Sequence, residues 1–330
     1  MHHILLMRLS VRNRFWLRLG AKERSIHRRN MGMDRSQKNC GGMIAVDIGK
    51  SRIKFGYFVA GSVVSPNKGT ERLPEPDSTF SGSPDALDAL SDWLSSLTNG
   101  CCESSSPSDA VLLWRIASVN RSSMQALKEW LTKNRSKDRI EQLKAADTGL
   151  DVVGPDPARV GIDRLVDALA ADRLREPSEG AIVVDTGSAI TIDLVAPDGS
   201  FRGGVILPGL AMGARSLHDA TDQLPHIDTA EFADVETAAP DLPGLSTESA
   251  MRAGLFWNAV GGIREAAARM QETLGVPCRV ILTGGDALSL APPLSESTDL
   301  LPGLPSVYVP HLTLAGIRLA NLRRPDRDPV

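Results

Sequence analysis

Two short segments of the chain each carry an aspartate, a glycine and a serine directly after an apolar run. In IAVDIGKS, Asp47 precedes Gly49 by two positions, and in IVVDTGS, Asp185 precedes Gly187 by two positions. A glycine at a tight turn lets backbone amides approach a phosphate group, and a carboxylate at a strand end can bind Mg²⁺ directly or through water. One Asp-x-Gly can be an ordinary β-turn, but two copies predict two turns that hold a nucleotide from both sides.

The letters Gly49-Lys50-Ser51 also end a P-loop, which reads G-x-x-x-x-G-K-[ST] and leads into a helix. The first glycine of that motif would fall on Ile44, and Gly42 lies two positions too early. Over residues 53–57 apolar side chains occupy every second position, which is the period of a strand. The sequence therefore excludes a P-loop and favours a β-hairpin with Asp47 at the end of its first strand.

A further chemical element is GIDR, residues 161–164, which opens a helix predicted over residues 160–175. The dipole at a helix N-terminus favours an ionised carboxylate, so Asp163 can accept a hydroxyl proton while Arg164 binds an anionic group of the same substrate. Phosphoryl transfer needs positioning and charge neutralisation more than a strong base. Because an acidic first turn and a surface arginine are common in helices, this pair indicates chemistry only together with the two hairpins.

The elements that must position these residues alternate between strands and helices, which predicts an α/β fold. Apolar runs predict strands after the two hairpin turns and within 110–120, 203–208, 278–283 and 307–309. Helical spacing predicts helices within 84–97, 122–133, 160–175, 209–217, 246–270 and after 310, the fifth beginning with a capping pattern at Ser246. Residues 62–84 and 99–109 are rich in Ser, Pro and Gly and are predicted to be loops.

Composition and charge limit the class of protein. The chain has 330 residues, 42% of them hydrophobic, and a net charge of −3. Residues 1–42 hold ten Lys or Arg and two Asp or Glu, so the rest of the chain carries −11. A folded part this acidic makes nucleic acid an unexpected partner.

The basic segment 1–42 breaks its apolar runs with arginines, so we expect neither a secretory signal nor a membrane span there. It is interpreted as a disordered extension or as an over-long start, with Met43 opening the first strand; a membrane-surface or targeting role is the alternative. The four cysteines show no metal spacing and predict no disulfide framework, as expected for the cytoplasm.

Taken together, the segments VDIGKSRIKFG, GIDRLVDALAA, VVDTGSAITIDLV, GSFRGGVILPGL, STESAMRAG, LTGGDA and PHLTLAGI resemble the type III pantothenate kinases of the acetate and sugar kinase, heat-shock ATPase and actin superfamily. The resemblance implies two RNase-H-like (actin-like ATPase) domains facing a central nucleotide cleft. They would comprise residues 43–179, completed by a C-terminal helix at 312–330, and residues 180–311. It also implies ATP-dependent phosphorylation of pantothenate to 4′-phosphopantothenate, the first step of coenzyme A biosynthesis.

The resemblance also implies residue roles. Asp163 would be the general base, and pantothenate would be bound by Gly161, Ile162, Arg164 and Thr247, the last from the partner in a homodimer. ATP phosphates would be bound by Asp47, Ile48, Gly49, Lys50, Ser51, Lys54, Gly187 and Ser188, with Thr191 beside them. Asp47 would bind Mg²⁺, and Asp185 a monovalent cation, K⁺ or NH₄⁺. No nucleic acid or membrane partner is expected.

The sequence also departs from the family pattern. Lys50 and Ser51 replace Asn and Thr in the first loop, Ile190 replaces a Thr after the second, and Asp167 stands where Asn is common. Residues 151–161 lack the tyrosine that the family often places against the substrate. The predicted base is retained, but two alternatives stay open: a kinase of the same fold for another small hydroxylated acid, and a non-catalytic regulatory or accessory protein.

Overall fold

The computed structural model describes residues 42–60, 73–83, 87–97, 111–154, 156–229, 239–295 and 306–320. The basic segment before Gly42, the predicted loop 99–109 and most of the predicted loop 62–84 lie outside the described residues. Of the four cysteines only Cys278 is described, as a buried free thiol. In the described part of the chain, no helix combines the length and the apolar character needed to cross a membrane.

The first sheet has five strands in the order β3-β2-β1-β4-β5. They are β1 (Met43–Ile48), β2 (Ile53–Phe58), β3 (Ser78–Gly82), β4 (Leu113–Ser118) and β5 (Arg139–Gln142). β1 pairs antiparallel with β2 and parallel with β4. The predicted first hairpin is therefore the β1–β2 pair at the middle of this sheet.

The second sheet repeats this arrangement with the order β10-β9-β6-β7-β8. Its strands are β6 (Gly180–Thr186), β7 (Ala189–Val195), β8 (Phe201–Pro208), β9 (Cys278–Thr283) and β10 (Ser306–Tyr308). β6 pairs antiparallel with β7 and parallel with β9, as β1 does with β2 and β4. The same strand order with the same directions is present twice, which confirms the predicted α/β fold with two RNase-H-like units.

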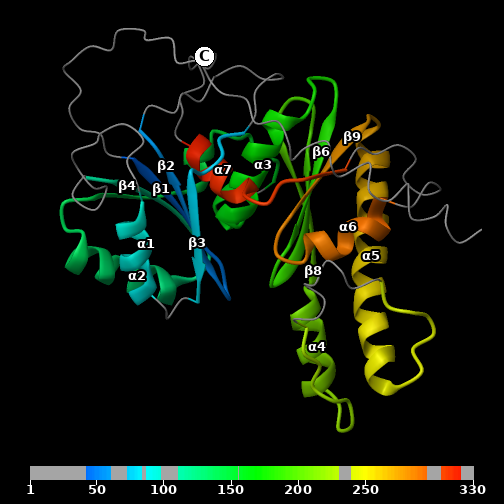
Figure 1. Cartoon of the computed structure of the whole chain (residues 1–330). Coiled ribbons are helices and arrows are strands. Elements are labelled where there is room, and N and C mark those ends of the chain that lie inside the picture. The colour runs from blue at the N-terminus through cyan, green and yellow to red at the C-terminus, as the bar shows by residue number, and fades with distance from the viewer. Residues whose placement is uncertain are drawn as a thin grey trace, which may run out of the picture. The chain divides into compact units, whose positions relative to one another are not determined.

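Each sheet has one face covered by its own helices (Figure 1). α1 (Asp88–Ser96) and α2 (Arg121–Asn134) pack their leucines on β1, β2 and β4. α5 (Thr247–Leu274) and α6 (Ala287–Ser295) pack on β6, β7 and β9. α4 (Leu210–Asp219) follows β8 directly and packs on the N-terminal half of α5.

The remaining faces of the two sheets share one core, built around α3 (Ile162–Leu174) and α7 (Leu312–Leu319). Leu165 and Ala170 of α3 lie in the same buried cluster as Ala45 of the first sheet and Val183 of the second. α3 and α7 approach closely, because a side chain at Gly316 would collide with the Val166 carbonyl. The helix that begins with the predicted catalytic pair is thus buried along nearly its whole length.

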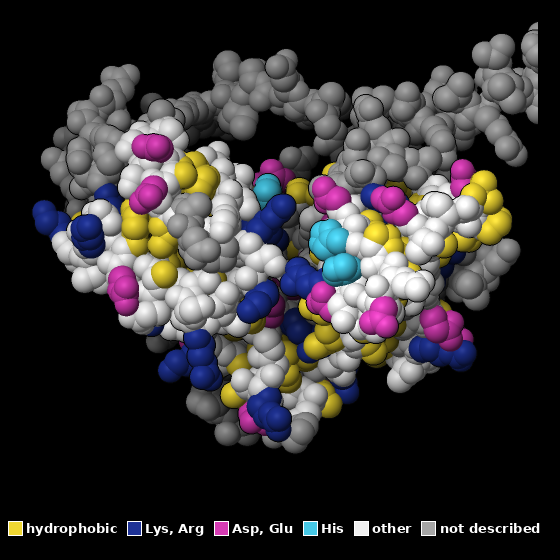
Figure 2. Space-filling view, turned by 90° about the horizontal axis from the view of Figure 1, so that it is seen from below, with side chains coloured by type: hydrophobic (Ala, Val, Ile, Leu, Met, Phe, Trp, Pro, Cys, Tyr) yellow, Lys and Arg dark blue, Asp and Glu magenta, His cyan; other side chains and the backbone are white. Residues whose placement is uncertain are grey.

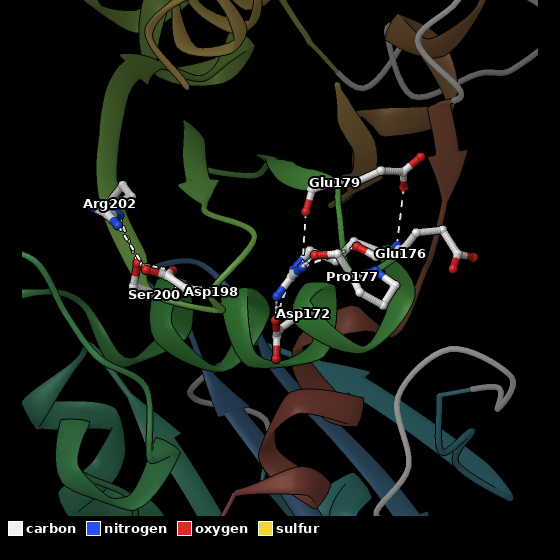
Figure 3. Close-up of polar contacts among 8 residues, drawn as sticks. Asp172, Glu176, Pro177, Glu179, Asp198, Ser200 and Arg202 are labelled. Carbon is white, nitrogen blue, oxygen red and sulfur yellow. Dashed lines mark hydrogen bonds and ion pairs between the residues drawn. The ribbon is translucent and has the colours of Figure 1, made fainter. Parts of the chain in front are cut away.

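The C-terminal end of α3 is held by a buried ion pair. The Arg175 guanidinium donates from Nε to Asp172 over 3.0 Å and from Nη1 to the Glu179 carbonyl over 3.0 Å. Figure 3 shows Asp172 and the Glu179 carbonyl joined through the guanidinium that lies between them. Both side chains of the pair are 1% exposed, so the start of β6 is fixed relative to α3.

Several predictions about elements need correction. β3 lies within residues 62–84, which were predicted to be a loop, and β5 was not predicted at all. The capping pattern at the start of α5 is confirmed, with Ser246 as the N-cap, but Ser249 completes the capping box. The short helices η1 (Ala145–Thr148) and η2 (Pro157–Arg159) lead into α3. The division into domains at residue 180 stays a prediction.

Candidate active site

The turn of the first hairpin spans residues 49–52, since Ile48 pairs with Ile53. The Gly49 amide donates to the Arg52 carbonyl over 3.0 Å and closes the turn. The side chain of Ile48 is fully buried, whereas Lys50 and Ser51 are exposed. Gly49 therefore closes the turn through its amide, and the exposed side chains of Lys50 and Ser51 are the ones that can contact a ligand.

The second hairpin has the same construction with a shorter turn. Gly187 donates its amide to the Ala189 carbonyl over 3.1 Å, which leaves Ser188 at the tip. Asp185 stands near the end of β6, as Asp47 does near the end of β1. Thr191, the partner of Asp185 in the β6–β7 ladder, lies beside this turn as predicted.

The two turns touch each other. The hydroxyl of Ser51 lies 2.8 Å from the hydroxyl of Ser188, although 137 positions separate them in the sequence. The predicted pair of glycine turns thus meets at one place, where the central hairpins of the two sheets come together. The space-filling view shows Lys and Arg side chains gathered around the middle of one face of the molecule (Figure 2).

The N-terminal turn of α3 brings the predicted base to the same region. Asp163 follows the N-cap Gly161 by two positions, and its Oδ1 accepts the Arg164 amide over 2.9 Å. A side chain at Gly161 would lie 2.5 Å from that oxygen, so glycine leaves the room that the carboxylate occupies. Ile162 is buried in the shared core.

Four carboxylates and one lysine form an acidic cluster, defined as Asp47, Asp163, Asp167, Asp185 and Lys54. Burial raises the pKa of Asp47 to about 6; Lys54, whose Nζ lies 3.7 Å away, acts in the opposite direction, and Asp163 and Asp185 add to the rise. Burial also raises the pKa of Asp185, with a smaller contribution from Asp163. For Lys54 burial lowers the pKa, but Asp47 and Asp185 outweigh it and the pKa is raised.

Asp167, one turn beyond Asp163 on α3, is the most deeply buried member of the acidic cluster. Burial, and next the charge of Asp185, raise its pKa well above the usual range. Its Oδ1 accepts no hydrogen bond within the described part of the chain. A surplus of carboxylates and an unpartnered oxygen fit a cation at this place, although the described residues include no group of three His, Cys, Asp or Glu side chains arranged to hold a metal.

Arg164 forms an ion pair with Asp193 of β7, a residue that we did not predict from the sequence. Arg164 Nε donates to both Asp193 oxygens, over 3.0 and 3.1 Å, and Nη2 donates to Oδ1. Burial raises the pKa of Asp193 to about 6, while the hydrogen bond and charge of Arg164 act against the rise. A signal was available: Asp193 is the only charged residue of β7, whose sequence is AITIDLV.

Thr247 lies apart from the other predicted site residues. It is exposed at the N-terminus of α5, one turn before Met251, whose side chain packs on Ala214 in the middle of α4. α4 itself begins against the second hairpin turn, because a side chain at Gly209 would collide with the Gly187 carbonyl. No hydrogen bond within the described residues joins Thr247 to the acidic cluster.

Comparison with known sequences gives the family. The sequence profile of the type III pantothenate kinases matches residues 43–269. A type III pantothenate kinase from Rhodopirellula baltica is 32% identical over 272 residues, which cover 82% of this chain and 94% of that protein. This chain belongs to the type III pantothenate kinase family. Another type III pantothenate kinase, from Acidiphilium cryptum, is 38% identical over 180 residues, which cover 54% of this chain and 61% of the relative.

Solved structures are similar only at the level of general shape. MreB 5 of Spiroplasma citri bound to AMPPNP gives a TM-score of 0.43 at 13% identity, over 84% of this chain and 95% of that one. A putative N-acetylmannosamine kinase from Listeria monocytogenes gives 0.42 at 16% identity, over 84% and 97%.

Proposed function

We propose that this chain transfers the γ-phosphate of ATP to pantothenate and forms 4′-phosphopantothenate for coenzyme A biosynthesis. The observation that carries the proposal is the 2.8 Å contact between Ser51 and Ser188, which joins the two glycine turns. Asp163 lies close enough to raise the pKa of Asp47, next to the first turn. Membership of the type III pantothenate kinase family supplies the identity of the acceptor.

In the proposed reaction Asp163 accepts the proton of the pantothenate hydroxyl as that oxygen attacks the γ-phosphorus. Its place in the first turn of α3 stabilises the negative charge that a base requires. Arg164 binds the pantothenate carboxylate, and the backbone at Gly161 and Ile162 borders the acceptor. A loose phosphoryl-transfer transition state needs this positioning more than it needs a strong base.

The phosphates of ATP are bound by the two turns. Gly49 and Gly187 use their own amides to close the turns, so the proposed phosphate contacts come from Lys50, Ser51 and Ser188. Lys54 contributes positive charge from β2, beside Asp47. Lys50 adds a second, exposed positive charge at the tip of the first turn.

Two cations complete the proposal, with Asp47 binding Mg²⁺ and Asp185 binding K⁺ or NH₄⁺. The surplus of carboxylates over lysine and the unpartnered Oδ1 of Asp167 support cation binding at the acidic cluster. When bound, Mg²⁺ neutralises charge on the phosphate oxygens. Lys54 meanwhile offsets part of the repulsion between these carboxylates and the nucleotide.

We further propose that the chain acts as a homodimer in which Thr247 serves the site of the partner. Thr247 lies at the far end of the α4–α5 pair from the second turn. β8 is an edge strand with Ile206 61% and Val205 38% exposed, and Met212 of α4 is 47% exposed. Apolar side chains along an unpaired edge favour association with a second chain.

The test is ADP release by the full chain with MgATP and K⁺, in the presence and absence of pantothenate. Replacing Asp163 by Asn should lower kcat by about 10²- to 10⁴-fold, the usual effect of losing a general base, while the KM for ATP stays unchanged. Asp198→Asn is the control, since Asp198 is an exposed turn residue that pairs with Arg202.

The outcomes distinguish a pantothenate kinase from a kinase for another hydroxy acid and from an accessory protein. Pantothenate-dependent turnover that is lost in Asp163→Asn supports the kinase and its base. Turnover with another hydroxy acid instead of pantothenate would favour the same-fold kinase of different specificity. Nucleotide binding without turnover on any acceptor would favour an accessory protein and would overturn the proposal.

A further inference from the structure

The Arg164 side chain is held on two sides. Asp193 accepts hydrogen bonds from Nε and Nη2, and the ring of Phe201 lies below the guanidinium with its centroid 5.6 Å from Cζ. Asp193 comes from β7 and Phe201 from the start of β8. Because a guanidinium is planar, contacts to one edge and one face fix its orientation.

Asp193 is itself fixed by the sheet around it. Its side chain is 2% exposed, and its partner across the β7–β8 ladder is Gly204. A side chain at Gly204 would collide with the Asp193 carboxylate and with the Ile192 carbonyl. The glycine at position 204 thus makes room for Asp193.

The pairing leaves a defined part of Arg164 for a ligand. A guanidinium has five N–H donors, and Asp193 accepts from Nε and from one N–H of Nη2. The remaining three are the two on Nη1 and the other on Nη2. Nη1 and Nη2 form the end-on edge of the guanidinium, which binds a carboxylate through two parallel hydrogen bonds.

Asp193 also separates Arg164 from a competing partner. Asp163 is the preceding residue on α3, and its carboxylate already accepts the Arg164 amide. Removal of Asp193 would free the guanidinium to pair with another carboxylate, such as that of the adjacent Asp163, which is the predicted base.

We propose that Asp193 is a positioning residue that holds the end-on edge of Arg164 toward the acceptor and thereby makes the site selective for hydroxy compounds that carry a carboxylate. This inference rests on the proposed kinase function, and it identifies Asp193 as a residue that gives the site its preference for acceptors with a carboxylate. Asp193 is assigned no contact with substrate or nucleotide, and its effect passes through Arg164.

The kinetic test uses Asp193→Asn in the full chain. The KM for pantothenate should rise roughly 10- to 100-fold, by analogy with the range for removing a residue that orients a metal ligand, while the KM for ATP stays unchanged. An analogue with a hydroxymethyl group in place of the carboxylate should be a poor acceptor for the wild type. For Asp193→Asn, the ratio of kcat/KM for pantothenate to kcat/KM for this analogue should be smaller than for the wild type. Asp198→Asn, an acid-to-amide change in the nearby β7–β8 turn, is the matched control.

A second measurement does not depend on turnover. In ¹⁵N spectra of the wild type, the Arg164 Nε–H should exchange slowly with water, because Asp193 accepts it; the Arg164→Lys variant identifies the signal by its loss. Rapid exchange, as for an exposed arginine, would overturn the proposal, as would an unchanged KM for pantothenate in a folded Asp193→Asn protein. Absence of pantothenate turnover in the wild type would instead refute the proposed kinase, and the exchange rate would still decide the role of Asp193.

Discussion

Asp47 binds its proton more tightly in the folded chain than in the unfolded one, so the free energy of unfolding must depend on pH. Its pKa is about 6 in the folded state against 3.8. Between these values the folded chain keeps a proton that the unfolded chain has released, so the free energy of unfolding falls as pH rises. The shift corresponds to about 3 kcal/mol at 1.36 kcal/mol per pKa unit, fully expressed above about pH 6.

We therefore expect Asp47→Asn to be more stable than the wild type at pH 7 and equal to it below about pH 4. Urea unfolding from pH 4 to 7, with a chelator present to remove Mg²⁺, measures the difference. Asp77→Asn is the control, because Asp77 lies in the same sheet region but outside the acidic cluster. Parallel pH profiles for wild type and Asp47→Asn would contradict this expectation.

Sequence spacing predicted the positions of single residues within the two hairpin turns, while their roles stay predictions. Asp47, Gly49, Gly187 and Ser188 lie where the repeated Asp-x-Gly pattern put them, since a tight turn fixes positions two or three residues apart. Asp193 could not be found this way, because its partner Arg164 is 29 positions away and on another element. The separation of Thr247 from the acidic cluster likewise depends on how α4 and α5 pack.

A methyl group added at Gly204 of β8 would meet neighbouring atoms, whereas one added at Gly261 of α5 would meet none. The two glycines should therefore respond to alanine in opposite ways. Gly204→Ala should lower the free energy of unfolding by about 1–3 kcal/mol, because the added methyl meets backbone and the Asp193 carboxylate rather than a flexible side chain. Gly261→Ala, with no atom near the new methyl, should raise it by about 0.5–1 kcal/mol by stabilising α5. Thermal and urea unfolding of both variants measure these changes. A neutral Gly204→Ala would show that β8 can shift away from β7.

Elements with strong periodicity were predicted, whereas β3 and β5 at the edges of the first sheet were not. The edge strands of the second sheet, β8 and β10, lie where apolar runs predicted strands. α1, α2, α3 and α5 bury regular apolar faces, and their ranges agree with the predicted helices. β3 and β5 lie at the two edges of the first sheet, where STFSG and RIEQ offer no alternating buried side chains. An edge strand needs only one hydrogen-bonded neighbour, so its sequence need not show the pattern of a buried strand.

At the scale of the whole molecule, the duplication was predictable because each copy carries the same signature 138 positions apart. The resemblance to the family also implied that a C-terminal helix completes the first domain. Local patterns by themselves did not predict the core in which α3 and α7 join both sheets. α7 comes from the C-terminal end of the chain and yet packs on β1. Such a contact depends on the long-range path of the chain, which local patterns do not encode.

Thr247 gives a test of the dimer at this same scale. If it serves the site of the partner, Asp163→Asn and Thr247→Ala chains should be inactive alone but active after they are unfolded together and refolded as a mixture. In a mixed dimer one site combines Asp163 of one chain with Thr247 of the other. With statistical pairing, half of the dimers carry one intact site, so about a quarter of the wild-type turnover should return. If Thr247 acts within its own chain, every site of the mixture lacks one residue and turnover stays absent.

A second test of the dimer uses the edge strand β8. A lysine at Ile206 opposes edge-to-edge association, so Ile206→Lys should sediment as a single chain where the wild type sediments as two. Val111→Lys, at an exposed apolar position just before β4, should leave the dimer intact. Because the monomeric variant would lack the partner's Thr247, it should also lose the ability to bind pantothenate while it still binds ATP. A wild type that already sediments as one chain would exclude the shared site and leave Thr247 without a role in it.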